Sequence, residues 1–188
     1  VGTDRVVPFK SVAENAAGEN SVAFDEKETF APEEATYPNG THVCELEIDM
    51  ATGEIELVDY TVVDDFGRVI NPLLLEGQVH GGIAQGLGQA ILESCQYESG
   101  SGQLLSASFM DYTMPRADDF PAIRFKRNEV PCETNPLGIK GAGEAGAIGA
   151  PPAIVNAIVN ALSDHGIRHV DMPVSPNKVW NILQNVSA

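Results

Sequence analysis

Residues 41–63 read THVCELEIDMATGEIELVDYTVV, and this stretch decides the fold class. Apolar and acidic side chains alternate in its first half: Cys44, Leu46, Ile48 and Met50 against Glu45, Glu47 and Asp49. A period of two places each set on one face of a half-buried strand. The segment Ala51-Thr52-Gly53 is typical of a turn. The stretch therefore predicts strands over 41–50 and 54–63 that pair as an antiparallel hairpin.

Residues 73–94, which follow the hairpin, are poor in β-branched side chains and favour a long helix. They contain five glycines, and each costs a helix roughly 1 kcal/mol relative to alanine: Gly77, Gly81, Gly82, Gly86 and Gly88. Two pairs are spaced i, i+4, so they form one smooth face of the helix. Either a second helix packs closely against this face or a flat ligand approaches its backbone.

Two further helices are predicted near the end of the sequence. Residues 151–163 begin with two prolines, which a first helical turn tolerates because its N–H groups lack partners. Residues 176–184 follow Ser175, a natural N-cap, and begin with Pro176. The first of these helices carries an apolar stripe: Ile154, Val155, Ile158, Val159 and Leu162.

The remaining elements complete an α+β fold. Apolar runs predict strands over 104–112 and 123–130. Strands and helices alternate without a regular βαβ rhythm, so we expect mixed or antiparallel strands packed with helices. Residues 41–188 form the expected domain. Residues 1–40 are a weakly patterned N-terminal segment of the same domain, with a short helix and surface loops.

The composition argues against two kinds of partner. The 188 residues include 27 acidic and 11 basic side chains and carry a formal charge of −16. Nucleic acids and anionic membranes are bound through Lys and Arg, so we expect neither as a partner. Cys44, Cys95 and Cys132 have no C-x-x-C spacing, which argues against a zinc or iron–sulfur site within this chain. Free thiols fit a reducing compartment, and we expect a cytoplasmic protein.

Residues 141–146 read GAGEAG and match the G-x-G-x-x-G pattern of dinucleotide-binding loops. That pattern has meaning only where a buried strand leads into it and a helix follows directly. Residues 131–138 contain two prolines and cannot form a central strand, and the helix expected from residue 151 begins too late. A nucleotide-binding loop is therefore disfavoured.

The same stretch isolates one carboxylate. Between Leu137 and Val155, the only charged residue besides Glu144 is Lys140. A carboxylate in surroundings of low polarity suits general-base work, because desolvation disfavours its charged form. The residues alone leave open a surface turn in which Glu144 points into water.

Six blocks of sequence occur in the order of one known family. Residues 135–146, NPLGIKGAGEAG, match the signature N-P-L-G-x-K-G-x-G-E-A-G. Residues 77–90, GQVHGGIAQGLGQA, match a G-Q-x-x-G-G-x-x-Q-G-x-G segment. The other blocks are residues 37–43, 63–72, 109–112 and 171–173. From Phe30 to Trp180 the chain thus resembles the large subunits of molybdenum hydroxylases, the xanthine dehydrogenase, aldehyde oxidase and CO dehydrogenase-type family.

This resemblance implies roles for four residues of a C-terminal molybdopterin-binding portion. Glu144 matches the catalytic base, which deprotonates a Mo–OH group before its oxygen attacks the substrate carbon. Gln78 matches the glutamine that contacts the cofactor, and the backbones of Gly143 and Ala145 are expected to support the same pocket. The pterin ligates the metal, so no protein metal ligand is predicted. We expect the side chains of Gln78 and Glu144 to converge on one cavity.

The resemblance also implies the wider enzyme. Its cofactor is molybdenum–molybdopterin, expected in the cytosine dinucleotide form, with [2Fe-2S] clusters and FAD on other domains or subunits. The expected partners are the remainder of the large subunit, the iron–sulfur and flavin parts, and a small-molecule substrate: an aldehyde, an N-heterocycle or CO. Complete large subunits are several times longer, so we expect a fragment without bound cofactor or activity of its own. A non-catalytic scaffold of the same fold is the alternative, and the intact Glu144 and Gln78 argue against it.

Overall fold

A computed structural model describes residues 6–16, 27–32 and 34–186 of the chain. The chain divides into two compact units, residues 1–33 and 34–188. The first unit contains one helix, α1 (Phe9–Ala16), which confirms the short helix predicted near the N-terminus. All other helices and strands of the described residues belong to the second unit.

Strands β1 (Asn39–Ile48) and β2 (Ile55–Asp65) form the predicted antiparallel hairpin. A β-bulge shifts their register between Glu45 and Leu46. The turn needs Gly53, whose φ of +77° is a left-handed conformation that side chains rarely adopt. A Cβ at this glycine would also collide with the carbonyl oxygen of Pro176, so the last helix lies directly against the turn.

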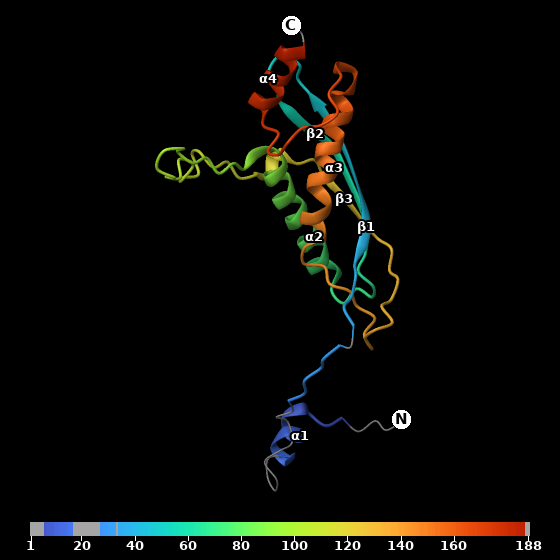
Figure 1. The fold of residues 1–188 in the computed structure, drawn as a ribbon. Helices are drawn as coiled ribbons and strands as arrows, with labels where there is room; N and C mark the ends of the chain where they lie inside the picture. Colours follow the sequence, from blue (N-terminus) through green and yellow to red (C-terminus); the bar gives the residue numbers. More distant parts are fainter. Residues whose placement is uncertain (1–5, 17–26, 33, 187–188) are drawn as a thin grey trace. The chain divides into compact units, whose positions relative to one another are not determined.

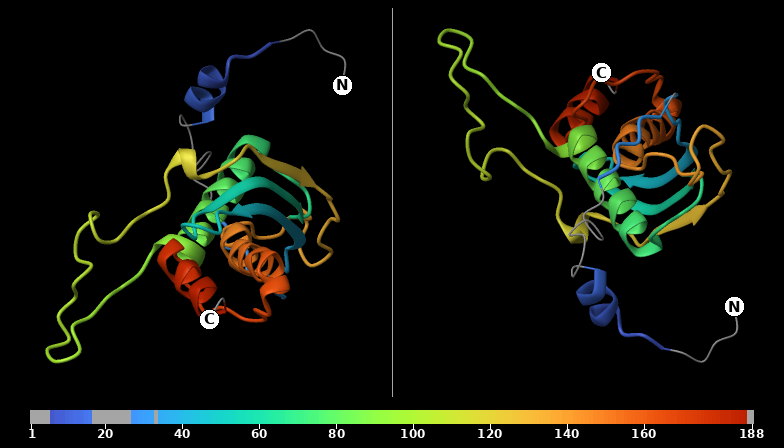
Figure 2. Two further views of the ribbon diagram at one scale, coloured as in Figure 1. Left: turned by 90° about the horizontal axis from the view of Figure 1, so that it is seen from above. Right: turned by 90° about the horizontal axis from the view of Figure 1, so that it is seen from below.

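Strand β3 (Ile123–Arg127) pairs with β2 in parallel and completes a mixed sheet of order β1-β2-β3. This confirms a strand within 123–130. The strand predicted over 104–112 is wrong, because this segment has only an isolated bridge between Tyr97 and Leu104. The segment pairs with none of the three strands of the sheet. It projects from the body as a long loop (Figure 2).

Helices α2 (Pro72–Leu87) and α3 (Ala145–Ala161) lie side by side, with α3 also packed against β1 (Figure 1). Helix α2 begins after Asn71, whose side chain accepts a hydrogen bond from the Leu74 N–H at 3.2 Å. It continues as a π-helical turn, η1 (Gly88–Leu92), so the predicted helix over 73–94 is confirmed with a change of hydrogen-bond pattern near its end.

Glycines bring α2 and α3 into close contact. A Cβ at Gly82 would lie 2.9 Å from the Ala147 nitrogen and 3.0 Å from the Gly146 Cα, both backbone atoms. A Cβ at Gly146 would lie 2.5 Å from the Val79 carbonyl oxygen. By contrast, a Cβ at Gly77 or Gly81 would meet nothing within 4 Å. Tight helix packing therefore explains part of the glycine-rich face and leaves the other part open.

Helix α3 starts six residues earlier than the predicted 151. The prediction placed Pro151-Pro152 in the first turn, whereas both prolines lie inside the helix. Pro151 is buried against α2, where a Cβ at Gly86 would lie 2.9 Å from its Cδ. Packing against α2 thus outweighs the hydrogen bond that an interior proline cannot donate. A helix does follow 141–144 directly, but a loop and not a strand precedes it, so the dinucleotide-binding pattern still lacks its context.

Helix α4 (Pro176–Val186) confirms the last predicted helix, and the Val179 N–H donates to the Ser175 carbonyl at 3.0 Å. Short 3-10 turns, η2 (Ala117–Asp119) and η3 (Ser163–His165), complete the elements. The core lies between the sheet and the helices, and its fully buried side chains include Tyr60, Val62, Val79, Ile83, Leu87, Ile154, Ile158, Leu162, Val174 and Val179. The predicted α+β class is confirmed.

Candidate functional site

The loop before α3 is held by its own signature residues. The Asn135 side chain donates to the Ile139 carbonyl at 2.9 Å and accepts from the Ile139 N–H at 3.1 Å. Gly138 turns the chain with a φ of +69°, and its carbonyl accepts hydrogen bonds from the N–H groups of Arg68 and Cys132. These bonds close the loop on itself and tie it to the end of β2.

A buried ion pair anchors the next part of the loop. The Lys140 Nζ lies 2.5 Å from the Asp65 Oδ2, and the two side chains are 12% and 6% exposed. Asp65 also accepts hydrogen bonds from the N–H groups of Gly67 and Val130. Burial opposes the charge of Asp65, but the hydrogen bonds from Lys140, Gly67 and Val130 outweigh it and lower the pKa of this carboxyl. Lys140 therefore serves the fold of the loop.

Gln78 and the Glu144 segment come together. The Gln78 Nε2 donates to the Gly143 carbonyl at 2.9 Å, across 65 residues of sequence. Glu144 is the N-cap residue of α3, and its side chain is exposed. The surroundings of low polarity that the sequence suggested around Glu144 are not formed by the described residues. The open alternative, a carboxylate that faces solvent, describes the geometry better.

Glu144 lines a cavity of about 480 Å³ at the junction of β1, β2 and α3. Gly143 and Ala145 line it as well, so three of the four predicted site residues share this cavity, and Gln78 reaches the same loop from outside it. The remaining lining residues are Pro38, Asn39, Gly40, His42, Asp64, Gly141, Ile148 and Gly149. The Gln78 side chain thus reaches the loop that carries Glu144, but the two side chains do not line one cavity as predicted.

Three buried polar side chains beside this cavity were missed by the sequence interpretation. The Tyr60 hydroxyl lies 2.8 Å from the His42 Nδ1, and the His42 Nε2 lies 3.7 Å from the Asp64 Oδ1. Tyr60 is fully buried, and Asp64 is 3% exposed. The hairpin alternation contained the signal, because His42 shares its face with Cys44. A polar residue on the buried face of a strand requires a partner.

Residues 1–121 match the family model of the molybdopterin cofactor-binding domain. The chain belongs to this family. Within it, the chain is 35% identical over 155 residues to the carbon monoxide dehydrogenase large chain of Hydrogenophaga pseudoflava, covering 82% of the chain and 19% of that protein. It is 38% identical over 150 residues to the nicotine 6-hydroxylase large subunit of Paenarthrobacter nicotinovorans, covering 80% of the chain and 18% of that protein.

A solved structure agrees with these relatives. Quinoline 2-oxidoreductase from Pseudomonas putida 86 is similar to the chain with a TM-score of 0.75 and 39% identity, over 78% of this chain and 19% of that one. The resemblance to molybdenum hydroxylase large subunits is therefore confirmed. The chain spans about a fifth of the length of the curated relatives it matches.

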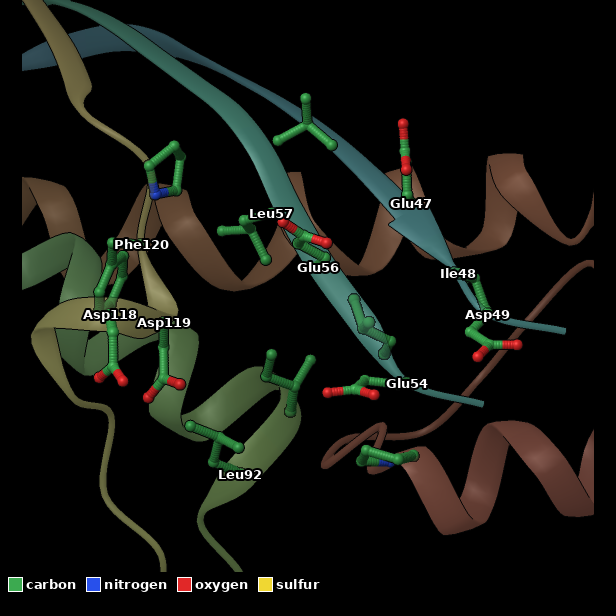
Figure 3. Close-up of a pocket in the computed structure, with 15 residues that line it drawn as sticks. Glu47, Ile48, Asp49, Glu54, Glu56, Leu57, Leu92, Asp118, Asp119 and Phe120 are labelled. Carbon is green, nitrogen blue, oxygen red and sulfur yellow. The ribbon is translucent and has the colours of Figure 1, made fainter. Parts of the chain in front are cut away.

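A larger cavity, with a volume of about 850 Å³, lies elsewhere in the second unit of the chain. Its lining contains apolar side chains, including Leu57, Leu92 and Phe120 (Figure 3), and six carboxylates: Glu47, Asp49, Glu54, Glu56, Asp118 and Asp119. It contains none of the predicted site residues. Acidic side chains at a solvated rim are ordinary for a chain of this charge, so this cavity receives no role.

The described residues contain no group of three or more His, Cys, Asp or Glu side chains placed to hold a metal ion. Within the same residues, no helix is long and apolar enough to cross a membrane. His80 is partly buried, and its Nε2 has no hydrogen-bond partner among the described residues.

Proposed function

We propose that this chain is the C-terminal, cofactor-facing part of the catalytic subunit of a molybdenum-dependent oxidoreductase. The complete enzyme would hydroxylate an aldehyde or an N-heterocycle, or oxidise CO. One observation carries the proposal: the hydrogen bond from Gln78 to the Gly143 carbonyl joins the two glycine-rich signature segments directly beside Glu144. The names of its relatives, a carbon monoxide dehydrogenase and a nicotine hydroxylase, agree with this class of reaction.

The backbone around this contact fits a flat cofactor. Gly77 and Gly81 flank Gln78 on α2, and Gly141 and Gly143 precede Glu144 on the loop. A Cβ at any of these four glycines would meet nothing within 4 Å, whereas a Cβ at Gly82 would collide with α3. Glycines that face open space do not serve packing within this unit. They allow a ligand to approach the backbone closely.

Glu144 and Gln78 have different proposed roles. When bound, the molybdenum cofactor supplies the two-electron redox chemistry. The Glu144 carboxylate accepts the proton that must leave the attacking oxygen nucleophile, which is general-base catalysis. The exposed Gln78 amide contacts the cofactor and, through the Gly143 carbonyl, fixes the loop that carries Glu144. The backbones of Gly143 and Ala145 form the adjacent wall.

The wider enzyme follows from the same proposal. We propose the cytosine dinucleotide form of molybdopterin, with [2Fe-2S] clusters and FAD carried by other domains or subunits that pass electrons onward. The remainder of the large subunit would supply the rest of the cofactor site and the substrate pocket. A non-catalytic scaffold would need neither a carboxylate at the cavity nor open glycines beside both Gln78 and Glu144.

The test is Glu144→Gln in the complete enzyme, which keeps the size of the side chain and removes the proton acceptor. Turnover per bound molybdenum should fall by at least about 10²-fold, since general-base catalysis contributes roughly 10²–10⁴-fold. Molybdenum content should stay near wild type. Gln78→Ala should lower cofactor content as well as turnover. Glu133→Gln, an exposed residue of the same loop outside the cavity, is the matched control and should change neither.

Steady-state kinetics normalised to molybdenum content decides between the two readings. A scaffold or a purely structural loop predicts normal turnover in every Glu144→Gln molecule that stays folded. The loss of a general base usually lowers turnover by more than about tenfold. A Glu144→Gln enzyme that keeps more than about a tenth of wild-type turnover per molybdenum would therefore contradict the proposed role of Glu144.

A further inference from the structure

The segment between η1 and η2 leaves the body of the second unit as an extended arm, residues 94–114 (Figure 2). The two ends of the arm meet at Gly88, where a Cβ would lie 2.9 Å from both the Glu93 carboxyl carbon and the Pro115 Cδ. The Tyr112 hydroxyl donates to the Glu93 carboxylate and closes this base. The arm therefore starts and ends at one fixed position, directly after α2.

The outer part of the arm is a short hairpin. The Leu105 N–H donates to the Gln96 carbonyl at 2.7 Å, and an isolated antiparallel bridge joins Tyr97 to Leu104. A two-stranded hairpin by itself is only marginally stable in water and needs a further surface to pack against. Tyr97 and Leu105 are nevertheless 62% and 56% exposed. The hairpin thus presents apolar side chains that the described residues do not cover.

A tight turn presents the two most exposed apolar side chains of the arm. The N–H groups of Asp111 and Tyr112 donate to the Ser108 carbonyl at 3.0 and 2.8 Å, so Phe109 and Met110 occupy the centre of the turn. Phe109 is 81% exposed, and Met110 is 89% exposed. Turns usually carry Gly, Pro, Asn, Asp or Ser. An aromatic and a thioether side chain at these positions therefore serve something other than the formation of the turn.

The arm also differs from the whole chain in charge. Two of its 21 residues are charged, Glu98 and Asp111, whereas the 188 residues of the chain include 27 acidic and 11 basic side chains. Depletion of charge, together with aromatic and methionine side chains, is typical of the buried core of a protein–protein interface. Exposed apolar patches of this kind mark surfaces that a partner covers. The arm therefore has the composition of an interface.

The remainder of the large subunit is the partner that fits the arm best. The chain spans 19% of the carbon monoxide dehydrogenase large chain and 18% of the nicotine 6-hydroxylase large subunit, so about four fifths of each relative lies outside the matched region. A second copy of the chain fits less well, because each copy carries a formal charge of −16 and two copies repel each other. A segment of the same polypeptide also meets the arm at a high effective concentration, whereas a second copy must associate from solution.

We propose that the arm docks into the remainder of the large subunit, with Phe109 and Met110 as its apolar anchors. This inference rests on the proposed function, because it requires that the chain is one part of a longer catalytic subunit. A few buried anchors contribute most of the free energy of such a contact. Because the arm begins directly after α2, its docking also holds the helix that carries Gln78 against the part of the subunit that would supply the rest of the cofactor site.

Site-specific cross-linking in the complete enzyme identifies what the arm contacts. Phe109 is replaced by its photoreactive analogue benzoylphenylalanine, and mass spectrometry identifies the cross-linked peptides after illumination. The expected product joins position 109 to a peptide of the large subunit outside these 188 residues, without an increase in the mass of the subunit. Gln184, an exposed polar residue of α4, is the control position and should give no such product. A cross-link to a second copy, to another subunit or within the 188 residues overturns the proposal, as does the absence of any cross-link.

A second readout uses a smaller change. Met110→Cys introduces a thiol at the turn, and mass spectrometry follows its alkylation by a maleimide in the complete enzyme. This reaction should be at least about tenfold slower than that of Gln184→Cys, because a docked side chain reacts only during local opening. Equal rates overturn the docking. Neither readout depends on turnover, so normal turnover in Glu144→Gln would contradict the proposed function with the cross-link still present, and the two failures are distinguishable.

Discussion

Gly81 and Gly82 are adjacent on α2, yet alanine should stabilise the protein at Gly81 and not at Gly82. A Cβ at Gly81 meets nothing within 4 Å, so Gly81→Ala gains the helix propensity of alanine, about 1 kcal/mol in the free energy of unfolding. A Cβ at Gly82 lies 2.9 Å from a backbone nitrogen of α3, which cannot move aside as a flexible side chain would. Overpacking of this kind costs about 1–3 kcal/mol.

Both variants gain the same helix propensity, so the expected difference between them is the cost of overpacking at Gly82. Gly82→Ala gains the same helix propensity of about 1 kcal/mol and loses about 1–3 kcal/mol to overpacking, so its net effect runs from near zero to about 2 kcal/mol of destabilisation. The two variants should differ by about 1–3 kcal/mol. Urea denaturation of the chain, followed by circular dichroism, measures both free energies with the neighbouring position as the control. Equal effects at Gly81 and Gly82 would refute the close contact between α2 and α3.

The same pair of variants also separates packing from cofactor binding. In the complete enzyme, Gly81→Ala places a methyl group on the open face beside Gln78, so molybdenum content should fall although the protein is more stable. Gly82→Ala should lose stability before it loses cofactor, because its Cβ points into α3. Molybdenum content of Gly81→Ala equal to that of wild type would show that a different surface faces the cofactor.

Two further predictions concern buried charges. Lys140→Met should destabilise the chain by about 3–5 kcal/mol in urea denaturation, because it leaves the buried Asp65 carboxylate without its cation; a loss below about 1 kcal/mol would show that the pair is solvated. Burial raises the pKa of Asp64 from 3.8 to about 6. The neutral form of Asp64 therefore stabilises the fold fully below pH 3.8, and this stabilisation is lost as the pH rises through about 6. The total loss in the free energy of unfolding is roughly 3 kcal/mol. His42, whose pKa is lowered, has the opposite sign and loses stability as the pH falls below 6.5. Thermal denaturation of Asp64→Asn against pH should lack the first contribution and keep the second.

Sequence patterns of neighbouring residues predicted the elements that are stabilised by contacts between those same neighbours. The alternation over 41–50 and the turn at Gly53 define the hairpin, because each face of a strand and each turn residue can be read from neighbouring positions. Ser175 likewise marks the start of α4. The site followed from the order of family motifs, and the contact between Gln78 and Gly143 agrees with it.

Such patterns could not predict the contacts between segments that are distant in the sequence. The parallel pairing of β3 joins Tyr60 to Ile123, and no local pattern specifies a partner 63 residues away. The start of α3 was missed because AGAIGA is weak as an isolated helix and becomes helical where α2 packs against Gly146. The run over 104–112 looks like a strand by composition, yet it pairs with none of the three strands, and composition alone does not specify a pairing partner.

The glycines of α2 link the local sequence pattern to the contacts between distant segments. Gln78 lies one helical turn before Gly82, and Glu144 lies two residues before Gly146, the glycine that Gly82 contacts. Close packing at Gly82 and Gly146 therefore fixes the first turn of α3 against α2, one turn away from the hydrogen bond between Gln78 and Gly143. A side chain at the packing glycines would move the two helices apart and separate Gln78 from the loop of Glu144. Helix packing and the proposed cofactor contact consequently depend on the same glycine-rich segment, because the packing at Gly82 fixes the position of Gln78 relative to the loop of Glu144.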